Sequence, residues 1–403
     1  MEDQFSVFFD VAQLLAIAGF TYAVVGTGYL WYGLACVPRL GDVVVPADCS
    51  NSQPSRLPVP RVSVIAPACN EAAAIEAAVR GFLALDWPRL EVIVINDRST
   101  DGTAAVLQRL EAEGDARLRV LTIADLPTGW LGKNHANAQG AALAQGEWLL
   151  FTDADVQLQP QILAKAMAHA VAEGFDHIAA APEARLPGGV LSQFALYFAL
   201  LFSVWARPWA ARNPRSRAHV GIGAFNLVRR SVYDAAGGHA AVRLCPDDDL
   251  ELGRCLKLVG GRQDFVFANG LAAVDWYGSW GEVRRGLMKN LFAGAGYSVP
   301  LVLVGAVAQL WLLAWPVPAL LLTSGLTWWL NLGILLVLGA QGWFAARFFG
   351  GRRYGGWLLP LFAVFGSYLM LRSMALALAN GGIEWRGTFY SLAELRGFPR
   401  RGK

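Results

Sequence analysis

Acidic residues follow two short apolar runs in this chain of 403 residues. "EVIVIND" ends at Asp97, and "EWLLFTDAD" ends with Asp153 and Asp155, two residues apart. Carboxylates at that spacing are hard oxygen ligands that can hold Mg²⁺ or Mn²⁺ while leaving positions for phosphate oxygens. A solvated turn is the alternative for either stretch alone, because Asp, Asn, Ser and Gly are the usual turn formers. Two such runs favour one shared site.

A third acidic stretch, "CPDDDLELGRCLKLVGGR", places Asp247, Asp248 and Asp249 before a predicted helix. Acidic residues at a helix N-terminus commonly cap it and interact with its dipole, so capping is the alternative interpretation. Three adjacent carboxylates exceed what capping needs. One of them could act as a general base towards a hydroxyl group.

Lys133 in "GWLGKNHANAQG" also precedes a predicted helix, where the helix dipole makes a cation unfavourable. It could reach a phosphate or one of the carboxylates, and a surface lysine is the alternative. His239 follows two glycines and has no His or Cys at ligand spacing, which favours a hydrogen-bonded structural residue over a metal ligand. The glycines of "GIGAF" at 221–225 permit close backbone approach to a ligand, but tight loops use them equally.

The central part of the chain alternates apolar runs with segments of helical periodicity. Strands are predicted over 61–68, 91–97, 117–123 and 147–155, separated by helices within 71–85, 102–114 and 134–146. Unbroken apolar strands alternating with helices predict an α/β fold with a parallel sheet covered on both faces. Ligands bind such sheets beyond the carboxyl ends of the strands, so the polar residues there are expected at one rim: Asn70, Glu71, Asp97, Asp153 and Asp155.

The composition is 55% hydrophobic and 16% charged, which is unusual for a wholly soluble protein, and the net charge of +3 gives no indication of nucleic-acid binding. Uncharged stretches at 11–37 and 290–346 are long enough for one and two membrane crossings, the latter with a turn near 323–325. A further apolar segment, 354–383, is interrupted by Arg372. The predicted organisation is therefore an anchor (1–40), a linker (41–60), a globular domain (61–290), apolar helices (291–384) and a basic tail (385–403).

The distribution of Lys and Arg predicts that the globular domain faces the cytoplasm. Acidic Glu2 and Asp3 precede the first apolar stretch and Arg39 follows it. Either the Arg372 segment does not cross, or the basic tail violates the charge rule; the sequence leaves both open. The five scattered cysteines are interpreted as reduced core residues. The aromatic segment 190–214 suits either a buried helix or one lying at the bilayer surface.

As an ordered set, "APACNEAA", "INDRSTDGT", "GWLGKNHA", "FTDADV", "GGHAAVR", "DDDLELGR" and "GLMKNLF" resembles the membrane-bound inverting glycosyltransferases of family 2. The closest likeness is to bacterial enzymes that act on carotenoid, hopanoid or other terpenoid lipids, with ceramide glucosyltransferases more distant. The likeness covers nearly the whole chain. It implies a Rossmann-like nucleotide-sugar-binding domain of the GT-A type with a mostly parallel sheet, in a bacterial inner membrane.

The resemblance also implies roles for individual residues. Donor binding, most simply of a UDP-sugar, would involve Pro67, Asn70, Glu71 and Asp97 at the base and ribose and Lys133 at the phosphates, with Asp153 and Asp155 binding the diphosphate through Mg²⁺ or Mn²⁺. Asp249 would be the catalytic base, with Asp248 in place of the family's usual Glu, so which of the two is the base stays open. The lipid acceptor region is expected to include Gly223, Phe225, His239, Trp280 and Lys289.

Processive polysaccharide synthases carry a Gln-x-x-Arg-Trp motif, and "SWGEVRRGLMKNLFAG" lacks the Arg-Trp pair. Transfer of a single sugar to a lipid hydroxyl or carboxyl is therefore expected over polymer synthesis. A nucleotide-binding scaffold or transporter without catalysis is the alternative from another class. A water-insoluble acceptor requires a site near the bilayer, so segments 190–212, 276–292 and 385–390 are expected to converge near Asp249.

Overall fold

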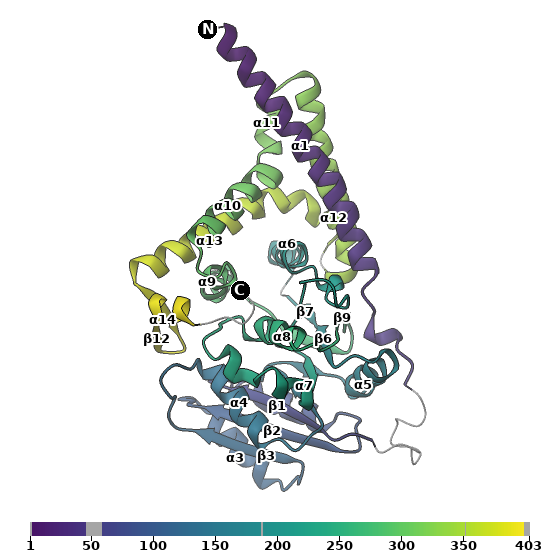
Figure 1. Cartoon of the computed structure of the whole chain (residues 1–403), viewed down its shortest axis with the longest axis vertical. Helices are drawn as coiled ribbons and strands as arrows, with labels where there is room; N and C mark the ends of the chain where they lie inside the picture. Colours follow the sequence, from purple (N-terminus) through teal and green to yellow (C-terminus); the bar gives the residue numbers. More distant parts are fainter. Residues whose placement is uncertain (1, 46–58, 187, 351, 399–403) are drawn as a thin grey trace. The chain divides into compact units, whose positions relative to one another are not determined.

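The computed structural model describes residues 2–45, 59–186, 188–350 and 352–398. The chain forms two compact units, each made of segments that alternate along the sequence (Figure 1). The sheet unit comprises Val37–Arg185, Ala206–Trp276 and Glu394–Lys403, and the helical unit comprises Met1–Cys36, Leu186–Trp205 and Tyr277–Ala393. The boundary at Trp276 differs from the one predicted at residue 290. Most of the predicted linker, with Cys49, lies outside the described residues.

A seven-stranded sheet with the order β3-β2-β1-β4-β8-β6-β9 organises the sheet unit (Figure 1). Only β8 runs antiparallel to its neighbours, β4 and β6, so the predicted mostly parallel α/β fold is confirmed. Every residue of β1 and β2 is buried, which explains their unbroken apolar runs. The strands are β1 Val62–Ala68, β2 Leu90–Asp97, β3 Leu118–Ile123, β4 Trp148–Phe151, β6 His177–Ala181, β8 Asn226–Arg229 and β9 Gln263–Phe267.

Helices cover both faces of this sheet. In β1, Val62 and Val64 join a core that includes residues of α2, α3 and α5, whereas Ile65 joins a second core with residues of α4, α7 and α8. The period of two in β1 therefore divides the strand between two helical layers. The helices are α2 Ile75–Leu83, α3 Thr103–Ala112, α4 Gly132–Leu143, α5 Ile162–Glu173, α7 Arg230–Ala235 and α8 Asp248–Leu258. A small second sheet contains β5 Gln157–Leu158, β10 Ala272–Asp275 and β7 Glu183–Arg185.

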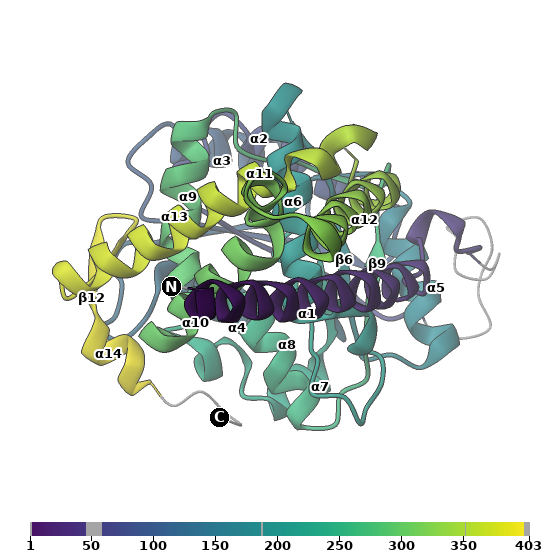
Figure 2. The same ribbon diagram turned by 90° about the horizontal axis from the view of Figure 1, so that it is seen from above.

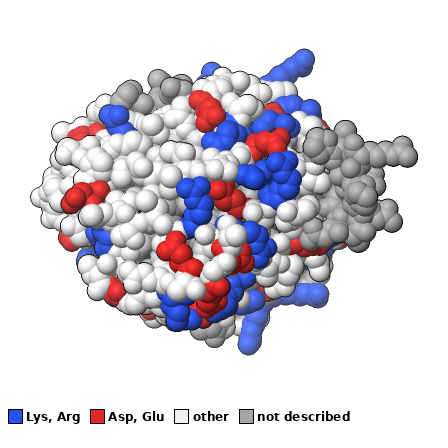
Figure 3. Space-filling view, turned by 90° about the horizontal axis from the view of Figure 1, so that it is seen from below, with Lys and Arg blue, Asp and Glu red and all other residues white. Residues whose placement is uncertain are grey.

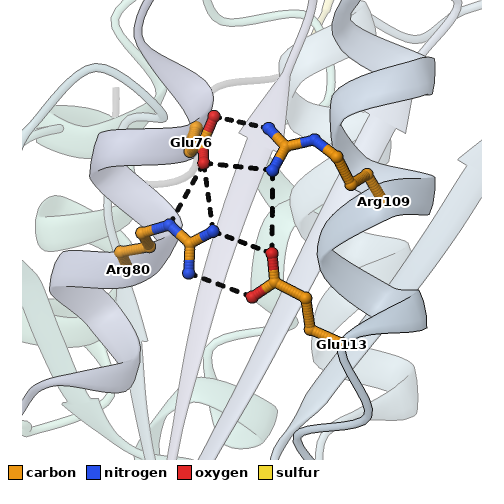
Figure 4. Close-up of polar contacts among 4 residues, drawn as sticks. All are labelled: Glu76, Arg80, Arg109 and Glu113. Atoms are coloured by element: carbon orange, nitrogen blue, oxygen red, sulfur yellow. Dashed lines mark hydrogen bonds and ion pairs between the residues drawn. The ribbon is translucent and has the colours of Figure 1, made fainter.

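A four-membered ion-pair network joins α2 to α3 on the surface (Figure 4). Arg80 contacts Glu76 at 3.0 Å and Glu113 at 2.8 Å, and Arg109 contacts Glu76 at 2.5 Å. Hydrogen bonds from Arg109 and Arg80 lower the pKa of Glu76, and Arg80 lowers the pKa of Glu113. Seen from below, acidic and basic side chains are interspersed on the exposed face (Figure 3).

We expect Glu76→Gln with Glu113→Gln to lower the unfolding temperature of the full chain in detergent near about pH 7, and we expect this effect to shrink progressively in acid. Both glutamates have lowered pKa values in the folded protein, so their stabilisation is present above the unfolded pKa and is lost as the pH falls through the folded one. Added salt should shrink the difference at neutral pH. If the difference in unfolding temperature between the variant and the wild type persisted unchanged in acid, helix packing and not the ion pairs would be its cause.

The helical unit consists mainly of long apolar helices. Its elements are α1 Glu2–Ala35, α6 Gly189–Ala206, α9 Trp280–Gly294, α10 Val299–Gln309, α11 Pro316–Leu322, α12 Gly325–Phe349, α13 Leu359–Ala379 and the hairpin β11 Gly382–Trp385 with β12 Thr388–Ser391; α14 Leu392–Gly397 follows. Helix α1 packs along α12, and α13 packs along both α9 and α10 (Figure 2).

Within the described residues, four helices are long and apolar enough to cross a membrane: Asp10–Ala35, Gly189–Ala210, Gly325–Phe349 and Arg353–Ala379. A fifth candidate is the pair Val299–Ala314 and Pro316–Leu322, which bends by 55° at a break. The predicted break near 323–325 is confirmed, because α11 ends at Leu322 and α12 begins at Gly325. Helix α6 was expected to be either a core helix or an interfacial one; its length and composition also suit a crossing.

Two of the three segments expected to converge, 190–212 and 276–292, contact each other within the helical unit. The ring of Phe194 on α6 lies 5.5 Å from that of Trp280 on α9, and Trp280 lies 5.4 Å from Phe365 on α13. Helix α9 also packs against β11, at the start of the C-terminal hairpin. These contacts gather aromatic side chains from three distant parts of the sequence. Their convergence on Asp249 stays a prediction.

Candidate active site

A small cavity lies next to the carboxyl end of β4 in the sheet unit. Its volume of about 10 Å³ is the space of roughly one water molecule. Six of the residues singled out from the sequence line it: Lys133, Asp153, Gly223, His239, Asp248 and Asp249. Four lining residues were missed: Asn137, Phe151, Thr152 and Asn226. Of these four, only Asn137 could have been identified from the sequence, because it lies one helical turn after Lys133.

Lys133, at the start of α4, occupies the centre of the acidic cluster. Its Nζ lies 2.7 Å from Asp153 Oδ1 and 3.8 Å from Asp248 Oδ1. Burial alone would lower the pKa of Lys133, but the carboxylates of Asp153, Asp248 and Asp249 outweigh it and raise that pKa. The ammonium group is therefore charged, and it offsets the repulsion that three gathered carboxylates would otherwise feel.

Asp249 lies in the first turn of α8 and is held by two backbone groups. The N–H of Gly223 donates to Oδ2 at 2.7 Å, and the N–H of Leu250 donates to Oδ1 at 2.8 Å. Burial raises the pKa of Asp249, while Lys133 and these two N–H groups oppose the rise. Burial likewise raises the pKa of Asp248, against the attraction of Lys133. Asp249 is thus a fixed carboxylate with a strengthened affinity for a proton.

Gly221 and Gly253 allow the segment around Gly221 to pass in direct contact with the backbone of α8. A Cβ on Gly221 would lie 1.8 Å from the carbonyl oxygen of Asp249, and a Cβ on Gly253 would lie 1.7 Å from that of Val220. The segment from Val220 to Gly223 therefore touches α8 backbone to backbone, which only glycine allows. This contact brings the Gly223 N–H within reach of Asp249. The glycines suggested a close backbone approach to a ligand, but at Gly221 the close approach is to the backbone of helix α8.

The polar residues of "INDRSTDGT" mainly hold the loop that follows β1. The Thr100 N–H donates to Asn70 Oδ1 at 2.8 Å, the Glu71 N–H to Thr103 Oγ1 at 2.8 Å, and the Ala72 N–H to Asp101 Oδ2 at 3.1 Å. Asn70 adopts a left-handed φ of 61° in this loop. The turn-forming residues after β2 thus fix the position of Asn70 and Glu71.

The other predicted site residues are not among the residues that line the cavity. Asp97 is buried and pairs with Arg98, whose Nε lies 2.8 Å from Asp97 Oδ1. Pro67 is buried within β1, and Asp155 follows Asp153 by two residues. Phe225 is fully buried in the hydrophobic core. Trp280 and Lys289 belong to α9 of the helical unit.

The described residues include no group of three or more His, Cys, Asp or Glu side chains arranged to hold a metal ion. The strand end supplies Asp153 and Asp155, and Mg²⁺ in nucleotide sites is typically held by one or two carboxylates together with substrate phosphates and water. The residues present therefore fit a cation that arrives with a diphosphate. They do not form a self-sufficient metal cage.

Comparison with known proteins gives the family of the domain. Residues 63–237 match "Glycosyl transferase family 2". The chain is 25% identical over 347 residues to a 4,4'-diaponeurosporenoate glycosyltransferase of Staphylococcus aureus, covering 83% of this chain and 89% of that protein. It is 32% identical over 120 residues to a GalNAc(5)-diNAcBac-PP-undecaprenol beta-1,3-glucosyltransferase of Campylobacter jejuni, covering 30% of this chain and 37% of that one.

A beta-monoglucosyldiacylglycerol synthase of Nostoc sp. is 37% identical over 107 residues, 26% of this chain and 22% of that protein. The chain thus spans much less than two thirds of the Campylobacter and Nostoc relatives. A solved mannosyltransferase from Pyrobaculum calidifontis in complex with GDP-Man and Mn²⁺ superimposes with a TM-score of 0.51 at 20% identity, over 91% of this chain and 98% of that one. That similarity supports the fold, and the family match confirms the resemblance: residues 63–237 of this chain are a glycosyl transferase family 2 domain.

Proposed function

We propose that the chain transfers a single sugar, with inversion, from a nucleotide-diphosphate sugar to a hydroxyl or carboxyl group of a membrane lipid. The observation that carries the proposal is the gathering of Asp153, Asp248 and Asp249 around Lys133 in one cavity beyond the carboxyl end of β4. Such a group can hold a diphosphate at one side and accept a proton at the other.

Asp249 is the proposed base. With a hydroxyl acceptor, its carboxylate takes the proton as the oxygen attacks the anomeric carbon from the face opposite the leaving nucleoside diphosphate, which gives inversion. The two backbone N–H groups on its oxygens keep the carboxylate in one orientation, and burial raises its pKa and so its basicity. Asp248 is the second candidate, since it also lines the cavity.

Donor binding is assigned to the residues around the rim. Asp153 and Asp155 would hold Mg²⁺ or Mn²⁺, and the bound cation would neutralise charge that builds up on the departing diphosphate. Lys133 would reach the phosphates, and Pro67, Asn70, Glu71 and Asp97 would hold the base and ribose. A UDP-sugar is the proposed donor. The solved mannosyltransferase with GDP-Man and Mn²⁺ supports a divalent cation on this fold.

The acceptor is proposed to be a lipid of the terpenoid, hopanoid, carotenoid or sphingolipid type. The relatives' names specify lipid or lipid-linked acceptors, and the described part of the chain has four to five helices that are apolar enough for membrane crossing. We place the enzyme in the bacterial inner membrane with the sheet unit in the cytoplasm, as the Lys and Arg distribution predicts. The acceptor residues expected from the sequence, Gly223 in the sheet unit and Trp280 and Lys289 in α9, remain a proposal.

The test is a donor panel with purified full-length protein in lipid nanodiscs. UDP-glucose, UDP-galactose, UDP-N-acetylglucosamine and GDP-mannose, each labelled in the sugar, are incubated with total bacterial lipid extract and the products are identified by mass spectrometry. We expect one sugar unit on one lipid class. A ladder of sugar units would establish a polysaccharide synthase, and donor binding without any product would establish a nucleotide-binding scaffold.

Chelation of divalent cations should abolish transfer, and added Mg²⁺ or Mn²⁺ should restore it. Asp155→Asn should raise the cation concentration needed for half-maximal rate by about tenfold or more, because one of the two proposed carboxylate ligands is lost. The titration is read from initial rates at saturating donor. Asp115→Asn is the control, since Asp115 pairs with Arg117 on the surface and does not line the cavity. Transfer that is insensitive to chelation would exclude the metal.

A further inference from the structure

One polar ring in the cavity has no part in the chemistry proposed above. His239 follows Gly237 and Gly238, whose φ angles of 84° and 55° lie in the left-handed region. A Cβ on Gly238 would lie 2.7 Å from the ring of Tyr233. The two glycines therefore let the chain fold back from α7, so that His239 returns to the side chain of Tyr233 six residues earlier.

Two hydrogen bonds join these residues. The backbone N–H of His239 donates to Tyr233 Oη at 3.1 Å, and Tyr233 Oη lies 2.9 Å from His239 Nδ1. The Tyr233 hydroxyl is buried, and the described residues offer its proton no other acceptor. Because a buried donor without a partner is costly, the hydroxyl donates to Nδ1. Nδ1 is then an acceptor, and the proton of the neutral imidazole is on Nε2.

The ring is neutral and fixed in place. Burial, together with the nearby Lys133 ammonium, lowers the pKa of His239 to about 3. The centroid of Phe151 lies 4.5 Å from that of His239, edge to face. His239 is therefore a rigid neutral donor at every pH at which the enzyme would work, and its proton is in a known position on the ring.

Within the described residues Nε2 has no protein hydrogen-bond partner, and the ring lines the cavity beside Lys133 and Asp153. A phosphate is better matched there by the charged Lys133. A hydroxyl group is different, because it accepts one hydrogen bond and donates another. Like a water molecule, a sugar hydroxyl can accept from the imidazole N–H and donate to a carboxylate of the same cavity, such as Asp248, at the same time.

We propose that the Nε2–H of His239 donates a hydrogen bond to a hydroxyl of the transferred sugar and so contributes to the choice of donor. The assignment rests on the proposed function. It moves His239 from the acceptor side of the reaction to the donor side, because the ring lines the same cavity as Lys133 and Asp153, to which donor binding is assigned.

The test combines variants of the full chain with donor analogues that each lack one sugar hydroxyl. UDP-glucose and its monodeoxy analogues are used, or the corresponding set for whichever donor the panel identifies. One analogue should lower kcat/KM of the wild type by about tenfold, as expected for one lost neutral hydrogen bond. His239→Phe keeps an aromatic ring beside Phe151; it should lose about tenfold with the complete sugar and show no further loss with that analogue.

Controls separate recognition from damage to the fold. His239→Phe should bind free UDP, or the nucleoside diphosphate of the donor found, as tightly as the wild type does, because UDP carries no sugar hydroxyl of the transferred unit. His239→Gln, which keeps an N–H donor, should recover part of the rate. Tyr233→Phe should weaken the same discrimination, since Nδ1 loses its donor. His219→Gln, whose ring contacts the Arg217 carbonyl, should resemble the wild type.

Equal penalties for every analogue in His239→Phe and the wild type would overturn the assignment, as would His219→Gln reproducing the behaviour of His239→Phe. Loss of UDP binding in both His239→Phe and His239→Gln would show that His239 has a structural role, and this result would also overturn the assignment. A wild type that binds UDP but transfers no sugar in the panel rejects the proposed function itself, and the assignment of His239 with it. These outcomes are distinguishable because UDP binding is measured separately from transfer.

Discussion

Asp249→Asn is expected to lower kcat for sugar transfer by about 10³-fold or more while leaving the affinity for the nucleotide sugar nearly unchanged. General-base catalysis contributes about 10²–10⁴-fold, and the amide has no basicity to replace the carboxylate. The amide oxygen can still accept from one of the two backbone N–H groups that hold Asp249, so α8 should keep its position. Single-turnover kinetics with labelled donor and a parallel binding titration separate the two effects.

Asp248→Asn is the matched comparison, because it removes the neighbouring carboxylate from the same cavity. Asp248 contacts Lys133 at 3.8 Å, so its loss should weaken the environment of the donor phosphates more than it slows the chemical step. An active Asp249→Asn enzyme together with an inactive Asp248→Asn enzyme would assign the base to Asp248. Loss of donor binding in both variants would assign the pair to binding and leave the base elsewhere.

Gly221→Ala should give the second large effect, a loss of both activity and stability. The new methyl group would lie 1.8 Å from the Asp249 carbonyl oxygen, a separation that forces the segment around Gly221 away from α8. The Gly223 N–H would then leave Asp249, which loses one of its two backbone donors. We expect a fall in kcat of about 10²-fold or more and a lower unfolding temperature, measured on full-length protein in detergent.

Gly41→Ala is the control for that substitution. A Cβ on Gly41 meets no atom within 4 Å, and Gly41 lies outside the cavity-lining set. It should match the wild type in unfolding temperature and rate. If Gly221→Ala also matched the wild type, the backbone contact between this segment and α8 would not be what orients Asp249.

The first half of the sheet could be predicted from the sequence because its signals are local. In β1 and β2 every residue is buried, so each reads as one continuous apolar run followed by polar residues. Parallel strands then place their carboxyl ends at one rim, which is how Asp153 could be associated with the cavity. Lys133 was found through its unfavourable position at a helix start.

The second half of the sheet could not be predicted from the sequence, because it depends on pairing between strands that are far apart in the chain. Strand β8 is only four residues long, and it is inserted antiparallel between β4 and β6. A run as short as "NLVR" carries no period that would assign its partners. Asn226, at the start of β8, lines the cavity and bonds His177 of β6 at 2.5 Å, so it could not be identified before that pairing was known.

The acidic residues after β2 show that local sequence cannot assign a role to each carboxylate. Asp97 and Asp101 are equally acidic in the sequence, yet Asp97 is buried against Arg98 whereas Asp101 accepts hydrogen bonds from the Ala72 and Thr103 N–H groups. Arg98 and Thr103 are near neighbours in the sequence, but Ala72 lies 29 residues before Asp101 and meets it only in the folded protein. Residue type and spacing alone cannot supply that information.

The position of α6 in the chain order has a consequence for biosynthesis. The helix emerges from the ribosome after β4 and β6 but before β8, the strand that joins them. Until β8 has been translated, β4 and β6 each present an unpaired edge, which is a hazard for aggregation. Lys133 and Asp153 precede α6, whereas Gly223 and Asp249 follow it. A nascent chain therefore has no complete cavity until α6 has been synthesised, so an immature chain cannot consume nucleotide sugar before that helix exists.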